Sequence, residues 1–85
     1  MPGDSYSGEW DDQNNRSGYG VQYWGTGAHY EGKWKSNFPH GYGRYHDHHG
    51  NTYEGLWKKG CRHGEGKYTE IKTERTITGM FNSVL

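Results

Sequence analysis

Aromatic and polar residues alternate along this chain with a period of two, which is the spacing of a β-strand, and no helical period of 3.6 residues competes with it. In the first such segment Tyr6, Gly8 and Trp10 fall on one face, whereas Ser7 and Glu9 fall on the other. The same unit recurs after 24, 23 and 24 residues, at 30–34, 53–57 and 77–81, with Ile77 and Phe81 in the last copy. A fixed spacing of this length predicts a protein built from structural repeats.

A second short element, Gly-x-Gly, lies between successive copies, at 18–20, 41–43 and 64–66. Turn-forming residues separate the two elements of each repeat, at 11–16, 36–40 and 58–62, so each repeat is predicted to be a β-hairpin. Further turn signals, at 25–27 and 47–50, connect one repeat to the next. The sequence therefore predicts an all-β protein, an elongated, twisted, single-layer antiparallel meander of hairpins. The seven expected strands span 4–10, 18–24, 28–34, 41–46, 51–57, 64–70 and 75–81.

The glycines of these strands need an explanation, because glycine within a strand costs order and packing. A glycine that faces a large ring on the neighbouring strand leaves room for that ring to lie across it, an arrangement known as aromatic rescue. We expect Tyr and Trp rings to cover the Gly-x-Gly pairs. The alternative is that the glycines mark β-bulges.

The composition supports an ordered chain in spite of its polarity. Only 28% of the 85 residues are hydrophobic and the mean hydropathy is −1.33, values that by themselves indicate disorder. However, four Trp, eight Tyr and two Phe make the chain 16% aromatic, which disordered chains are not. The length leaves room for one small domain, 1–85, and for no separate catalytic domain.

Charge and cysteine content restrict the partners and the compartment. Ten Lys and Arg balance ten Asp and Glu, which disfavours nucleic acid as a ligand because its binding needs a basic excess. The single Cys61 cannot form an internal disulfide, and residues 1–10 lack the basic and apolar segments of a signal peptide. We therefore expect a cytoplasmic protein. Neither a nucleophile–base–orienter set nor a substrate pocket is apparent, so we expect no enzyme activity and no small-molecule substrate.

The repeat unit, Tyr-x-Gly-x-Trp followed by Gly-x-Gly and a turn glycine, resembles the MORN repeat. It is clearest at 30–43 and at 53–66. On this resemblance the repeats span about 6–29, 30–52 and 53–76, with a terminal half repeat at 77–85. The first copy has an extra residue in its hairpin loop and has Gln22 where the later copies have Tyr45 and Tyr68. The turn before the last copy has Thr73 at the place expected for glycine.

The resemblance implies a non-enzymatic scaffold or adaptor for protein–protein interaction, within a cytoskeletal, ciliary or flagellar assembly. Its partner would be another protein, a cytoskeletal or axonemal component that presents an amphipathic helix or an extended peptide. The alternation places the aromatic residues of the repeat motif on one face of the sheet, where they would bind this partner or pack on one another. These candidate partner-binding residues are Tyr6, Trp10, Tyr30, Trp34, Tyr53, Trp57 and Phe81. No cofactor is expected.

Two alternative ligands have weaker support in the sequence. The segment His46-Asp47-His48-His49 carries metal-ligand side chains, yet it lies at a predicted turn where polar residues are usual, so no metal site is expected. Acidic phospholipids are a second possibility, since several basic residues would line one edge of the sheet, with acidic residues interleaved. The residues of this basic strip are Lys33, Lys35, Lys58, Lys59, Arg62 and Lys67.

Overall fold

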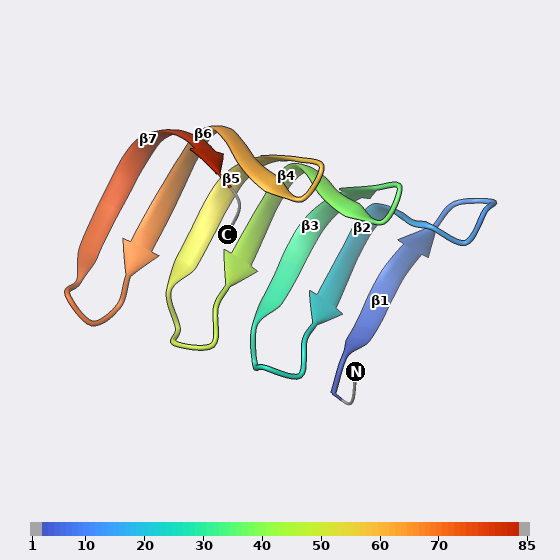
Figure 1. The fold of residues 1–85 in the computed structure, drawn as a ribbon, viewed down its shortest axis with the longest axis horizontal. Helices are drawn as coiled ribbons and strands as arrows, with labels where there is room; N and C mark the ends of the chain where they lie inside the picture. Colours follow the sequence, from blue (N-terminus) through green and yellow to red (C-terminus); the bar gives the residue numbers. More distant parts are fainter. Residues whose placement is uncertain (1–2, 84–85) are drawn as a thin grey trace.

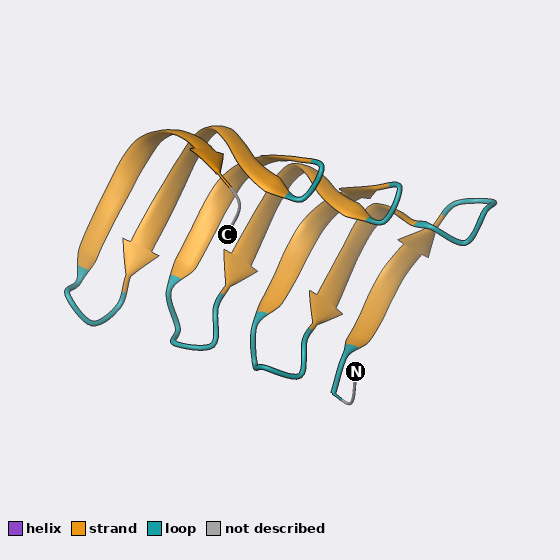
Figure 2. Ribbon diagram, viewed as in Figure 1, coloured by secondary structure: helices purple, strands orange, loops and turns teal. Residues whose placement is uncertain are grey.

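The computed structural model describes residues 3–83, which form one open antiparallel sheet of seven strands in the order of the sequence. Figures 1 and 2 show the strands side by side in a single layer, with no helix among the described residues. The molecule is elongated, 42 × 28 × 16 Å. The strands are β1 (Ser5–Trp10), β2 (Arg16–Tyr23), β3 (His29–Lys35), β4 (Phe38–His46), β5 (Thr52–Lys58), β6 (Cys61–Glu70) and β7 (Arg75–Ser83). The predicted all-β meander is confirmed; the last two residues of the half repeat 77–85 lie outside the described residues.

The hairpin turns inside the second and third repeats are shorter than the sequence suggested. Ser36 and Asn37 alone connect β3 to β4, and Lys59 and Gly60 alone connect β5 to β6. All four residues have positive φ, as the two-residue turns that match strand twist require. The predicted turns 36–40 and 58–62 were therefore too long, because Pro39 was interpreted as a turn residue although it lies in β4, paired with Trp34.

The loops between repeats share one hydrogen-bonding pattern that corrects the alignment of the last copy. Gly27 donates its backbone N–H to Trp24, Gly50 to Asp47, and Glu74 to Ile71. The residue with positive φ in the last loop is therefore Glu74, at φ 55°, and Thr73 was the wrong counterpart of the turn glycines. A non-glycine residue in this conformation is strained, so the last connection is the least favourable of the three.

The glycines have two distinct roles, and the expected ring cover is confirmed only for the second glycine of each Gly-x-Gly pair. A Cβ at Gly43 would overlap the Tyr30 ring, and Gly20 and Gly66 lie in the same way beneath Tyr6 and Tyr53. The covering ring is always Tyr, not Trp. The motif glycines, for example Gly32, lie at register shifts that interrupt the pairing, which are β-bulges.

Each bulge also supplies a partner for the tyrosine that crosses it. The Tyr30 hydroxyl donates to the carbonyl of Lys33, three residues further along the same strand, at 2.9 Å. Tyr6 and Tyr53 make the same bond to Glu9 and Leu56, at 2.8 and 3.3 Å. A buried phenol needs such a partner, so the Tyr, the glycines and the bulge form one structural unit that each repeat reproduces.

Candidate functional site

The seven candidate partner-binding residues form one continuous row of rings across the sheet. Neighbouring rings meet edge to face, with centroids 4.8–5.5 Å apart and planes at 73–89°. Such contacts stabilise aromatic pairs by about 0.5–1.5 kcal/mol beyond area burial. The row runs Trp10, Tyr6, Trp34, Tyr30, Trp57, Tyr53, Phe81. The structure thus brings all seven predicted residues together.

Burial changes sharply along this row. Tyr30 and Tyr53 expose no surface, and Trp34 and Trp57 are only 4% and 5% exposed, whereas Trp10 at the end of the row is 55% exposed. The two buried indoles also donate their Nε1–H groups to the carbonyls of glycines on the neighbouring strand, at 3.0 and 3.2 Å. The four central rings are therefore the core of the protein. Their direct contact with a partner stays a prediction.

Arginine side chains cover the row in the first and third repeats. The Arg16 guanidinium lies 4.7 Å from the centroid of Trp34 and 5.9 Å from that of Tyr6. Arg62 lies in the same way over Phe81 and Tyr53, at 5.2 and 5.6 Å. Arg62 was assigned to the basic strip from sequence, but its position over these rings places it on the aromatic face instead.

Gln22 stands where the later repeats have Tyr, and its hydrogen bond with Arg16 accounts for this difference. Arg16 donates through Nη1 to the Gln22 side-chain oxygen at 2.8 Å, and through Nη2 to the carbonyl of Asn37 at 2.9 Å. Gln22 is the buried polar residue among those described, 6% exposed. The Gln22 side-chain oxygen thus accepts from a charged donor, so a buried polar atom has its hydrogen-bond partner.

The middle repeat has an open hollow at the place that arginine covers in its neighbours. This middle hollow has a volume of about 320 Å³ and is mainly apolar. Sequence reasoning missed it, although Trp24, a tryptophan outside the repeat motif, and Pro39, which interrupts the arginine pattern, were both signals. The residues that line the middle hollow are Trp24, Thr26, Ala28, Tyr30, Pro39, Tyr45, Trp57 and Gly60.

The tyrosine hydroxyls of the middle hollow are held neutral. Burial raises the pKa of Tyr45, and the nearby Asp47 carboxylate raises it further. Burial raises the pKa of Tyr30 as well, strongly. Both phenols consequently remain protonated at physiological pH, so the hollow offers ring faces and neutral oxygens and carries no charge of its own.

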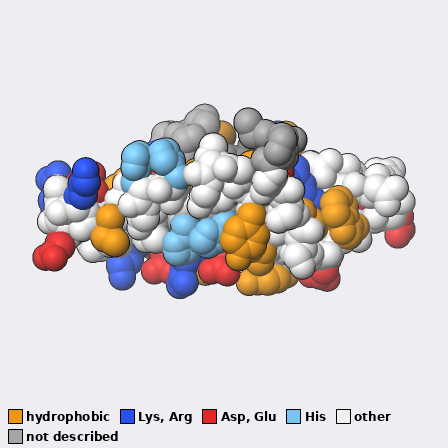
Figure 3. Space-filling view, turned by 90° about the horizontal axis from the view of Figure 1, so that it is seen from below, with side chains coloured by type: hydrophobic (Ala, Val, Ile, Leu, Met, Phe, Trp, Pro, Cys, Tyr) orange, Lys and Arg blue, Asp and Glu red, His pale blue; other side chains and the backbone are white. Residues whose placement is uncertain are grey.

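The opposite face of the sheet carries charged side chains together with exposed aromatic and aliphatic ones, and it makes its own contacts. Arg44 pairs with Glu54 at 3.0 Å and with Glu31 at 3.8 Å, and the rings of His29 and His46 stack with centroids 4.2 Å apart. Figure 3 looks onto the edge that carries the loops between repeats and shows histidines near its middle, flanked by charged side chains.

The predicted histidine segment does not converge on one point. His46 stacks on His29, while the Asp47 carboxylate accepts the backbone N–H groups of His49 and Asn51, both at 2.9 Å. These two bonds hold the pKa of Asp47 below its usual range, although burial acts in the opposite direction. The described residues contain no cluster of three His, Cys, Asp or Glu side chains that fits a metal ion. The Asp47 side chain is thus used to shape the turn.

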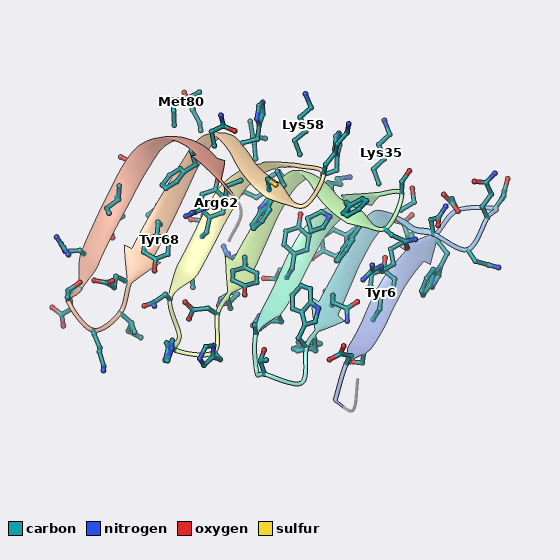
Figure 4. The ribbon with its side chains drawn as sticks, in the orientation of Figure 1. Tyr6, Lys35, Lys58, Arg62, Tyr68 and Met80 are labelled. Atoms are coloured by element: carbon teal, nitrogen blue, oxygen red, sulfur yellow. The ribbon has the colours of Figure 1, made fainter. Side chains whose placement is uncertain are left out.

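The hairpin ends form a basic edge on the described part of the sheet. Figure 4 shows Lys35 and Lys58, which hold equivalent places in successive repeats, pointing away from the sheet at the same edge. Lys59 and Phe38 are exposed at these turns too, Phe38 by 52%. A surface that mixes lysines with an exposed ring suits contact with an acidic partner or membrane surface.

The fold and the ring row define a module of stacked β-hairpin repeats without an enclosed catalytic cleft in its described part. The MORN-repeat family model matches three consecutive segments, 6–29, 30–52 and 53–69, which together make up most of the chain. The chain belongs to the MORN-repeat family. Proteins with these repeats are generally associated with protein or membrane interactions, and the family is an interaction module and not an enzyme family. A search of curated protein sequences gave no match. No helix among the described residues is long and apolar enough to cross a membrane.

Proposed function

We propose that the protein is a non-enzymatic scaffold or adaptor that docks a segment of another protein on its aromatic face. The middle hollow supports this proposal most directly, because it opens a mainly apolar depression where the row of rings is otherwise covered. Apolar and aromatic surface left open in the centre of a small domain is typical of an interaction site.

The dimensions of the site favour side chains of a polypeptide over a larger ligand. A hollow of about 320 Å³ is at the lower limit of small-molecule pockets and accommodates one or two side chains. An extended peptide or the apolar face of an amphipathic helix, laid along the row, would insert such side chains while its backbone stays at the rim. We place this activity in the cytoplasm, in a cytoskeletal, ciliary or flagellar assembly, with no cofactor, nucleic acid or small-molecule substrate.

The basic edge of the hairpin turns favours a second candidate, a peripheral membrane module that binds acidic phospholipids. Lys35, Lys58 and Lys59 would contact the headgroups, and the exposed Phe38 would enter the interface. Each lysine near an acidic surface contributes about 1 kcal/mol. Three lysines at one edge of a chain without net charge make this the weaker of the two candidates.

Trp24 is the residue whose truncation tests the scaffold function. It is half-buried at the rim of the middle hollow, against Tyr45, so Trp24→Ala removes contact area but none of the four core rings. Because Trp24 also packs against the core, the thermal midpoint of the variant is measured alongside its affinity. We expect affinity for a partner purified with the tagged protein and identified by mass spectrometry to fall by about 2 kcal/mol, roughly thirtyfold. Calorimetry with the purified pair measures this change.

The control variant carries Gln in place of Lys58 and Lys59. It should leave that affinity nearly unchanged, because exposed rim charges act mainly on the association rate and its salt dependence. The lipid candidate predicts the reverse, with flotation on acidic liposomes that the lysine pair abolishes and Trp24→Ala preserves. Recovery of no stoichiometric protein partner, together with such flotation, would overturn the scaffold proposal.

A further inference from the structure

The first and third repeats place an arginine at one equivalent position, and the middle repeat places a proline there. Arg16 pairs with Trp10, Pro39 with Trp34, and Arg62 with Trp57. The backbone confirms the equivalence of the first two, because the carbonyl of Arg16 accepts the N–H of Asn37, and the carbonyl of Pro39 accepts the N–H of Gly60, both at 3.0 Å. The middle repeat thus has a proline where its two neighbours have an arginine.

Both arginines use the same two kinds of ring. Each guanidinium lies over the motif Tyr of its own repeat and over the motif Trp or Phe of the next one, at centroid distances of 4.7–5.9 Å. The counterparts of these rings in the middle repeat are Tyr30 and Trp57, and both line the middle hollow. The hollow therefore lies at the position that an arginine side chain occupies in the two neighbouring repeats.

We infer that the middle hollow receives an arginine side chain of the partner protein, which takes the position that Arg16 and Arg62 hold in the neighbouring repeats. This inference rests on the proposed scaffold function and names the group that the site recognises. The guanidinium would lie against the ring faces of Trp57 and Tyr30, as Arg16 lies against those of Trp34 and Tyr6. The chain itself shows this side chain accepted twice by the same kind of site.

Polar groups around the hollow complete the arrangement. Three oxygens accept from the Arg16 guanidinium, those of the Gln22 side chain, the Asn37 backbone and the Asn37 side chain, the last at 3.3 Å. The middle repeat has counterparts of the first two, the Tyr45 hydroxyl and the Gly60 carbonyl, whereas Gly60 has no side chain to supply the third. An uncharged hollow with oxygen acceptors favours a guanidinium over an ammonium ion, because the guanidinium is planar, stacks on rings and is less strongly hydrated.

Titration of the unmodified protein with short capped peptides, Gly-X-Gly with X as Arg, citrulline, Lys or Leu, tests the inference. The Trp57 indole N–H, which donates to the Gly43 carbonyl, is the reporter in NMR spectra, and the Trp34 indole beneath Arg16 is the internal control. We expect the Arg peptide to shift the Trp57 signal with at least about fivefold higher affinity than the neutral, isosteric citrulline peptide. A Leu peptide that shifts Trp57 as strongly, or an Arg peptide that leaves Trp57 unchanged, would overturn the inference.

Substitutions at Pro39 provide a second, independent measurement. P39R should fill the hollow from within, as Arg16 does, and abolish the response of Trp57 to the Arg peptide. P39A is the matched control, since it also loses the proline ring but leaves the hollow open and should retain the response. The thermal midpoint of P39R should exceed that of P39A; a lower midpoint would show that the hollow rejects an arginine side chain.

The same variants separate this inference from the proposed function. A purified partner protein that binds P39R as tightly as the unmodified chain would leave the scaffold function intact and refute the arginine inference. If the Arg peptide shifts the Trp57 signal but no partner protein is recovered, the result supports the arginine inference and contradicts the scaffold function. A partner that binds the unmodified chain can be tested with P39R and with its own arginine replaced by Leu. Loss of binding in both cases supports the scaffold function and the arginine inference together.

Discussion

Strands β1 and β3 carry the same motif, yet the two strands bury it very differently. In β3, Trp34 is 4% exposed, whereas Trp10, at the same motif position in β1, is 55% exposed. Trp34 has Tyr6 on one side and Tyr30 on the other, with Arg16 above it, while Trp10 contacts Tyr6 alone among the described rings. The same motif therefore gives a core residue in the centre and a surface residue at the end.

This difference shows how a single-layer sheet makes a core at all. With no second layer to cover them, rings are shielded only by the rings of adjacent strands, so burial requires a neighbour on both sides. Stability then accumulates along the row, and the first and last strands contribute least.

Truncation of a central ring should show the largest difference between centre and end. Trp57→Ala removes a 5%-exposed indole, its contacts with Tyr30 and Tyr53, and its hydrogen bond to Gly43, and should destabilise the fold by about 3–5 kcal/mol. Trp10→Ala should cost about 1 kcal/mol or less, because its ring is mostly solvated already. Chemical denaturation of both variants measures this, and equal losses would contradict the neighbour argument.

An added side chain beneath a tyrosine should show a smaller difference of the same kind. Gly43→Val must displace the Tyr30 ring, which is fully buried, and should cost about 1–3 kcal/mol through overpacking. Gly20→Val should cost less, since the Tyr6 ring above it is half-exposed and can move outward.

A double-mutant cycle isolates the ring as the cause. Once Tyr30→Ala has removed the ring, adding Gly43→Val should cost far less than it does alone, giving a coupling energy of the order of 1 kcal/mol or more. Additive effects in the denaturation midpoints would eliminate aromatic rescue as the explanation for this glycine.

The smallest expected effect is on pH dependence and concerns the opposite face of the central strands. Burial and the stacked His29 lower the pKa of His46 below its usual 6.5, with Arg44 acting in the same direction and Glu31 and Asp47 opposing it. Below about pH 6.5 the unfolded chain therefore binds a proton that the folded chain excludes, and stability should fall as the pH decreases towards 5.5. Denaturation midpoints of His46→Gln should fall less over this range, whereas His63→Gln, at an exposed position, should behave like the unmodified protein. A steeper fall of the denaturation midpoint in His46→Gln would show that folding does not lower the pKa of His46.

The repeat motif and the strand pairing could be predicted from the sequence because they depend on local spacing. Tyr30, Gly32 and Trp34 fall on one face by the geometry of a strand alone, and the Gly-x-Gly pair follows at a constant distance. The exact turns could not be read in the same way, since Pro39 and Ser36 both favour turns and only the pairing of the strands shows which of them lies in a strand.

The sequence by itself determined the fold class, the number of strands and the set of rings that gather on one face, because each follows from a period within one hairpin. Only the tertiary structure decided which rings are buried and where the surface is open. Those properties depend on residues of neighbouring repeats that are far apart in the sequence: Arg16 over Trp34 closes one site, and Pro39 beside Trp57 leaves the next one open. A periodic sequence specifies which positions are equivalent. Different residues at those positions make different contacts with the neighbouring repeat, and these contacts give each repeat its own surface.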